Sequence, residues 1–198
     1  TDLDIKSPML NVIVRISIAN ATTGELLQKS DPSNKCVSAY EKTDYISPVA
    51  THGIKLDDLA MLSPYWDETF LFNEPVTTIL SDEVMIFFEI FDTYIHISRH
   101  NFTPIAWSFL RLKNPEECRN LGRPCQLQLH YYPSVSFDIS LKGNKLPVQT
   151  LLLNRKKCKG RLTVEVRREE MQETYDITKR PKNFFQHEVG REELEKLI

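Results

Sequence analysis

One apolar run constrains the fold of this chain more than any other feature of its sequence. Residues 84–91 read VMIFFEIF, and only Glu89 in this run is not apolar. The run is rich in β-branched and aromatic residues and is shorter than most helices, which favours a strand. Because a strand that is apolar at nearly every position must be covered on both faces, we predict that residues 84–91 form a central strand with hydrophobic core on either side.

Further segments have the composition of strands and are bounded by turn residues. Together with the central run, we expect strands at residues 12–18, 25–27, 44–49, 66–72, 84–91, 104–112, 126–132 and 161–166. Helical periodicity is confined to short pieces at residues 54–62 and 192–198. This pattern predicts an all-β protein, an antiparallel β-sandwich with about eight strands.

The sandwich is expected to occupy residues 1–168 as one domain, since a chain of this length can bury a core without disulfides or metal ions. After Arg168 the sequence becomes polar and charged. We predict that residues 169–198 form a charged linker with a short C-terminal helix. The sequence opens without an initiating Met, and we expect it to be a fragment of a longer protein.

Cysteine usage indicates the compartment. The four cysteines, Cys36, Cys118, Cys125 and Cys158, form no CxxC pair and no zinc-finger spacing. This pattern favours a reduced, cytoplasmic protein. The alternative is a secreted domain in which Cys118 and Cys125 form a disulfide, but small secreted domains usually contain many disulfides.

The charge distribution excludes one class of partner and indicates another. A formal net charge of −2 predicts no binding to nucleic acid. Five of the seven residues from 155 to 161 are nevertheless basic: Arg155, Lys156, Lys157, Lys159 and Arg161. We expect this run to form a turn just ahead of the strand at residues 161–166. Such a turn either binds anionic lipid headgroups or an acidic partner, or it is a solvated turn that protects a sheet edge.

The segment at residues 66–72 resembles the paired-strand signature of C2 domains. It reads WDETFLF, similar to the pattern W-[ND]-E-x-F-x-F, and the apolar run that follows ends in Asp92, as the second strand of that signature does. Trp66, Phe70 and Phe72 alternate with period two, so we expect them to point inward against the central strand. The resemblance implies that the sandwich is a C2-like Greek-key domain.

A closer resemblance is to the C2-like region of the jouberin family. The similar stretches include VSAYEK at residues 37–42, IAWSFL at 105–110 and LQLHYYP at 127–133, and the likeness extends over most of residues 1–167. It implies a non-catalytic protein-interaction module of a cytoplasmic scaffold at the ciliary basal body and transition zone, required for ciliogenesis. The implied partners are other ciliary transition-zone proteins and a Rab-type small GTPase.

Calcium binding is not expected, although the resemblance is to C2 domains. Those domains hold their ions with about five Asp carboxylates, because Ca²⁺ takes six to eight oxygen ligands. Asp92 is present here, but Tyr94 stands where those domains place a second Asp, and His96 and His100 follow in the same loop. We therefore expect a calcium-independent module without metal or other cofactor.

Catalysis is not expected either. The sequence contains no nucleophile elbow, no phosphate-binding Gly loop and no pair of carboxylates in a catalytic pattern. Two functions from different classes follow from these observations. The first is the protein-interaction module that the resemblance implies. The alternative is a peripheral membrane module in which the basic run at residues 155–161 docks on anionic phosphoinositide lipids while the sandwich positions it.

Overall fold

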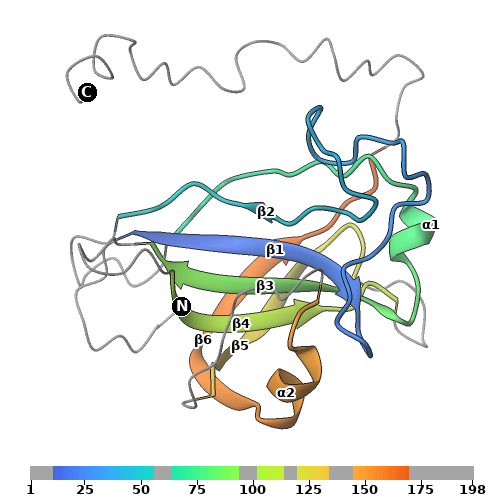
Figure 1. Cartoon of the computed structure of the whole chain (residues 1–198). Helices are drawn as coiled ribbons and strands as arrows, with labels where there is room; N and C mark the ends of the chain where they lie inside the picture. Colours follow the sequence, from blue (N-terminus) through green and yellow to red (C-terminus); the bar gives the residue numbers. More distant parts are fainter. Residues whose placement is uncertain (1–10, 56–63, 94–101, 114–119, 134–144, 170–198) are drawn as a thin grey trace, which may run out of the picture. The chain divides into compact units, whose positions relative to one another are not determined.

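The computed structural model describes residues 11–55, 64–93, 102–113, 120–133 and 145–169. Figure 1 shows the elements in these ranges, which are β1 (Val12–Asn20), β2 (Val49–Ala50), α1 (Val76–Ile79), β3 (Val84–Asp92), β4 (Thr103–Leu110), β5 (Pro124–Tyr131), α2 (Val148–Leu153) and β6 (Lys156–Glu165). No helix among these described residues has the length and apolar composition needed to cross a membrane. The tail predicted as a linker with a short helix lies outside the described residues beyond Glu169, and that prediction stays untested.

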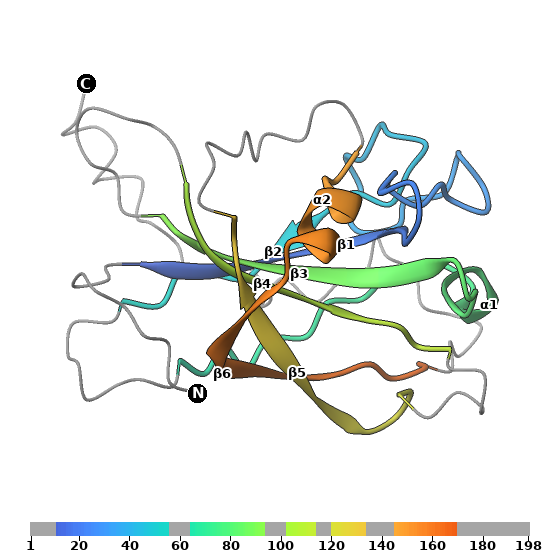
Figure 2. The same ribbon diagram turned by 90° about the horizontal axis from the view of Figure 1, so that it is seen from below.

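The strands form one antiparallel sheet with the order β2-β1-β3-β4-β5-β6. Strands β3 to β6 follow one another as a meander, whereas β2 pairs with the outer side of β1. Figure 2 shows the same sheet from below, with β3 between β1 and β4. The prediction that residues 84–91 form a central strand is therefore confirmed.

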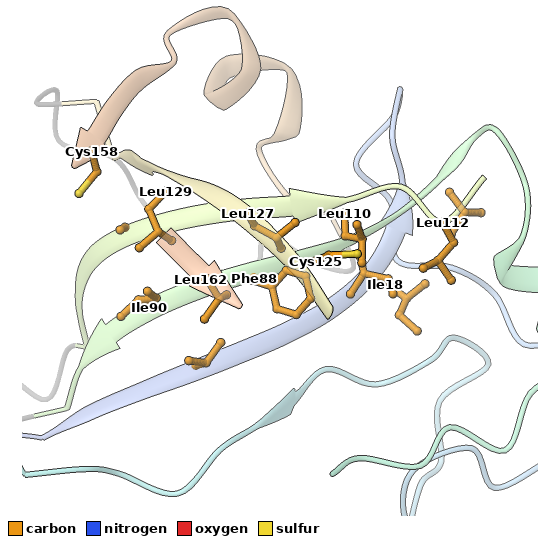
Figure 3. Packing of buried hydrophobic residues seen from close by; sticks show 14 of the residues in the cluster. Ile18, Phe88, Ile90, Leu110, Leu112, Cys125, Leu127, Leu129, Cys158 and Leu162 are labelled. Atoms are coloured by element: carbon orange, nitrogen blue, oxygen red, sulfur yellow. The ribbon is translucent and has the colours of Figure 1, made fainter. Parts of the chain in front are cut away.

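Both faces of β3 are buried, as its apolar composition requires. On one face, Ile86, Phe88 and Ile90 belong to the first core cluster, which β1, β4, β5 and β6 complete (Figure 3). On the other face, Met85 and Phe87 belong to the second core cluster. Successive residues of β3 thus belong alternately to the first and to the second core cluster.

The two core clusters have different covers. The first is covered by a mostly irregular layer from residues 27–55 and 64–80, which contributes the buried side chains Cys36 and Ile46 and several partly buried ones. The second is covered by Leu146 and by Val148 and Leu151 of α2. The result is an all-β, sandwich-like fold in which, among the residues that the structure describes, one layer is a regular sheet and the layer over the first core cluster is mostly irregular.

The prediction of about eight strands is not confirmed, because the described residues contain six strands in one sheet. Segments 25–27 and 44–49 contribute mainly isolated bridges, such as Ala19 with Leu26 and Gln28 with Tyr45. The segment 66–72 is not a strand at all. Asp67 has a φ angle of 43°, in the left-handed region that an extended strand does not use, and this residue interrupts the predicted ladder.

Trp66 still packs toward the core, although it is only partly buried. Its indole Nε1 donates a hydrogen bond to the carbonyl of Val12 on β1 at 3.3 Å, and Phe72 packs against the same first core cluster. The expected inward direction of these two side chains is therefore confirmed without the expected strand.

A buried ion pair fixes the irregular layer. The Lys29 ammonium lies 3.0 Å from the Glu41 carboxylate, and both side chains are almost inaccessible to solvent. Lys29 also donates to the carbonyls of Asn34 and Thr43, at 3.0 and 2.7 Å. A buried charge is tolerated only when it is paired and hydrogen-bonded, and this pair connects the two ends of a loop through both kinds of contact.

Candidate functional site

The predicted basic run lies at the start of strand β6 and not in a turn. Arg155 directly precedes the strand, and Lys156, Lys157, Lys159 and Arg161 belong to it. The strand was expected to begin at residue 161 and begins at Lys156 instead. The physical reason is that Cys158, Gly160 and Leu162 are buried at every second position, so that Lys157, Lys159 and Arg161 occupy the alternate, outward positions of a strand.

In the part of the chain that the structure describes, β6 is an edge strand, because it stands last in the order of the sheet. Its exposed positions include Lys156, Lys157, Lys159 and Arg161, whereas Cys158 and Leu162 join the first core cluster. Lys157, Lys159 and Arg161 are thus displayed on one face of a strand whose other face anchors it in the core, and Lys156 is exposed where the strand begins. The sequence predicted that these cations cluster but not that a strand spaces Lys157, Lys159 and Arg161 at every second position.

Within the described residues, the cations of the run have few side-chain partners that accept a hydrogen bond or form an ion pair. Arg161 donates to the Gln126 side-chain oxygen at 3.1 Å, and none of the ion pairs seen in those residues includes a cation of the run. The positive field reaches the neighbouring strand: burial lowers the pKa of His130 on β5, and the charges of Arg155 and Lys157 lower it further. This surface is therefore positively charged and available to a negatively charged partner.

The ladder between β5 and β6 is irregular beside the cations. Gln128 is opposite Arg161 and His130 is opposite Lys157, so that four residues of β6 span two of β5. The Gln128 side-chain amide donates to the carbonyl of Cys158 at 2.6 Å and thereby satisfies a backbone group within the shifted segment. Such bulges are common at sheet edges.

An exposed apolar side chain adjoins the run. Leu153, the last residue of α2, is 82% exposed and is separated from Arg155 by one residue. Leu151 of the same helix is fully buried in the second core cluster. The helix is thus held by its inner face while its last residue stands beside the basic run.

A second polar cluster lies within the sheet and was not predicted from the sequence. Glu89 is 1% exposed, and its carboxylate accepts hydrogen bonds from Arg15 Nε at 2.7 Å and from the Tyr132 hydroxyl at 3.0 Å. Burial raises the pKa of Glu89, against the opposing effect of Arg15. The available signal was the single charged residue of the apolar run at 84–91. Because these groups satisfy one another, we interpret the cluster as structural.

The end of β3 does not show the ligand set of a calcium site. Asp92 Oδ1 accepts a hydrogen bond from the backbone N–H of Asn11 at 3.3 Å. Across the described ranges, no group of three or more His, Cys, Asp and Glu side chains is placed to hold a metal ion. Tyr94, His96 and His100 lie outside these ranges, and their predicted roles stay untested.

The alternative of a disulfide between Cys118 and Cys125 is wrong for this structure, because Cys125 has a free thiol. Cys36 and Cys158 are also free and buried. Burial raises the pKa of the Cys36 thiol to about 12, with a further contribution from the nearby carboxylates of Glu74 and Glu41. These thiols belong to the core, where they act as small apolar side chains.

Comparison with known proteins finds relatives but no matching family model. Jouberin from Mus musculus is 30% identical over 151 residues, which cover 68% of this chain and 14% of jouberin. Jouberin from Rattus norvegicus matches with the same identity and the same coverage. The chain therefore contains a jouberin-like region, and the match spans only 14% of the length of these curated relatives.

Proposed function

Starting from the jouberin-like region, we propose that this chain is a C2-like protein-interaction module of a cytoplasmic scaffold at the ciliary basal body and transition zone, where it acts in ciliogenesis. The observation that carries the proposal is the 30% identity to jouberin over 68% of the chain. The ciliary role comes from the resemblance. Its partners in this proposal are other transition-zone proteins and a Rab-type small GTPase.

The fold supports a binding role for the module. A sheet with core on both faces is a rigid platform, and its edge strand β6 displays cations that no ion pair within the described residues uses. Rigid elements position binding groups more sharply than loops do. A Greek-key C2 topology belongs to the proposal, since it requires strands beyond the six of the described sheet.

We propose a module that works without catalysis and without calcium. The charged clusters support this, because Glu89 is hydrogen-bonded by Arg15 and Tyr132 within the sheet. Glu41 is likewise paired with Lys29 inside the irregular layer. In each cluster the carboxylate is committed to its structural partners, which favours stability over proton transfer.

The proposal is tested in cells that lack the endogenous full-length protein. We expect the wild-type protein to concentrate at the ciliary base and to restore the fraction of ciliated cells. A protein without residues 12–166 should restore neither, at an abundance matched to wild type by immunoblot. Full restoration of cilia by the deleted protein would contradict the proposed role of this module.

A further inference from the structure

We propose that strand β6 binds an extended acidic segment of a partner protein along its outer edge. The proposal rests on the interaction function proposed above and names the chemistry of the partner. β6 ends the order of the sheet, and β5 is its ladder partner within the residues that the structure describes. An edge strand presents backbone N–H and C=O groups to which an extended peptide can add as a further strand.

The side chains of β6 define what kind of segment fits. Lys157, Lys159 and Arg161 are exposed at every second position, which sets successive cations about 7 Å apart along the strand. A strand that adds to this edge has the same period, and its side chains lie about 5 Å from those opposite. If the partner carries a carboxylate at every second position, each carboxylate therefore lies opposite one of the three cations.

The irregular ladder limits where backbone pairing begins. β6 pairs regularly with β5 from Arg161 to Glu165, and the register shifts between Gln128 and His130. We therefore expect the backbone of the partner to pair with residues 161–165. Its carboxylates then extend along Lys159 and Lys157, whose flexible side chains can reach them across the bulge.

Charge complementarity favours this occupant over a second copy of the chain. Two β6 edges that pair with each other along residues 157–161 would set Lys157, Lys159 and Arg161 of one copy against those of the other, and like charges opposite one another destabilise a sheet. An anionic membrane would use the same cations. A lipid surface, however, has no spacing that matches alternate positions of a strand, so the dependence on spacing distinguishes the two ligands.

Two synthetic peptides of one composition provide the probe. In the first, Glu alternates with Val over eight positions; in the second, the Glu residues are contiguous. We expect the alternating peptide to bind the full chain about tenfold more tightly in fluorescence anisotropy, which corresponds to about 1.4 kcal/mol. Binding should weaken as salt rises, because exposed ion pairs are screened. Equal affinity for the two peptides would overturn the register that we propose.

Charge reversal tests the residues. In the triple variant Lys157→Glu, Lys159→Glu and Arg161→Glu, binding of the alternating peptide should weaken by at least about tenfold. The matched control reverses Lys42, Lys55 and Arg111, which are exposed cations outside β6, and should bind like wild type. Circular dichroism establishes that both variants are folded. If the charge reversal unfolds the chain, the triple variant Lys157→Gln, Lys159→Gln and Arg161→Gln takes its place and should also bind the alternating peptide more weakly than wild type.

A vesicle sedimentation assay distinguishes an acidic peptide from an anionic lipid surface as the ligand of the basic run. Wild type that sediments with phosphatidylinositol-bisphosphate vesicles but binds neither peptide would overturn the proposal in favour of a lipid ligand. The triple reversal is also expressed in the ciliary assay. If it loses the peptide and yet restores cilia, the edge has no part in the module and the inference fails while the module function stands. If both are lost together, the inference is supported.

Discussion

At the scale of single residues, the buried Glu41 connects stability to pH. Burial raises the pKa of this carboxyl, but hydrogen bonds from Ser47, Lys29 and Cys36 outweigh that effect and bring the pKa to about 2, from an ordinary 4.5. A pKa that is depressed in the folded state means that the unfolded state binds more protons in this range. The stabilisation is therefore fully present above pH 4.5 and is lost as the pH falls toward 2.

Glu41→Gln is expected to reduce the free energy of unfolding by about 3–5 kcal/mol near neutral pH, because it leaves Lys29 buried without a partner charge. The acid limb of the stability curve should become shallower, since one of the carboxylates that titrate there is gone. Urea unfolding at a series of pH values measures both effects. The double variant Lys29→Met and Glu41→Leu removes both charges and should cost less than the single change. A larger cost for the double variant would contradict a penalty from unpaired charge.

The two tryptophans differ in burial and should differ in energy. Trp107 is fully buried, stacks on Phe87 at a centroid distance of 5.5 Å and donates to the carbonyl of Tyr131. Trp107→Ala should lower the free energy of unfolding by about 3–5 kcal/mol. Trp66→Ala should lower it less, because Trp66 is only partly buried. Tyr65→Ala is the exposed control, and a cost for Trp66→Ala that equals or exceeds that for Trp107→Ala would contradict this ranking.

At the scale of elements, the sequence predicted what periodicity determines. The apolar run at 84–91 requires cover on both faces, and it is the central strand β3. The start of β6 was placed too late, because Lys156–Lys159 reads as a charged cluster before the alternate burial of Cys158 is known. In the segment 66–72 the alternation of Trp66 and Phe72 suggested a ladder. Alternation determines which side chains point inward, whereas a ladder also needs a neighbouring strand with free backbone groups.

The candidate site was likewise predictable only in part. The five cations were visible in the sequence as one run, but their place on the edge strand depends on the order of the whole sheet. Glu89 and its partners were missed for the same reason. Arg15 and Tyr132 are far from Glu89 in the sequence and meet it only in the folded sheet, where β1 pairs with β3 and Tyr132 directly follows β5. Contacts of long sequence separation are not encoded in any local pattern.

The end of β3 predicts how the chain responds to calcium. Asp92 accepts a hydrogen bond from Asn11, and the next loop position of the C2 pattern is occupied by Tyr94. Millimolar Ca²⁺ should therefore leave the melting temperature unchanged in scanning calorimetry. A ligand that binds only the folded state would add about 2.7 kcal/mol at one hundred times its dissociation constant. A rise of several degrees would show that this loop binds calcium after all.

At the scale of the whole molecule, β3 makes the two core clusters depend on each other. Ile86, Phe88 and Ile90 face the first cluster, and Met85 and Phe87 face the second, so neither core can open without exposing part of the same strand. Unfolding that exposes the core on one face of β3 should therefore expose the core on the other face as well. We therefore predict one cooperative unfolding transition rather than separate loss of the irregular layer and of the α2 side.

Probes on the two sides of the sheet test this prediction. In a variant with Trp66→Phe, fluorescence reports on Trp107 in the second core cluster. With Cys118→Ser and Cys125→Ser, thiol labelling reports on Cys36 and Cys158, which are buried in the first. Both signals should change at the same urea concentration and with the same slope, because a two-state transition exposes both cores at once. If the thiols react at a lower urea concentration than the one that changes Trp107, the irregular layer unfolds first and β3 does not couple the two cores.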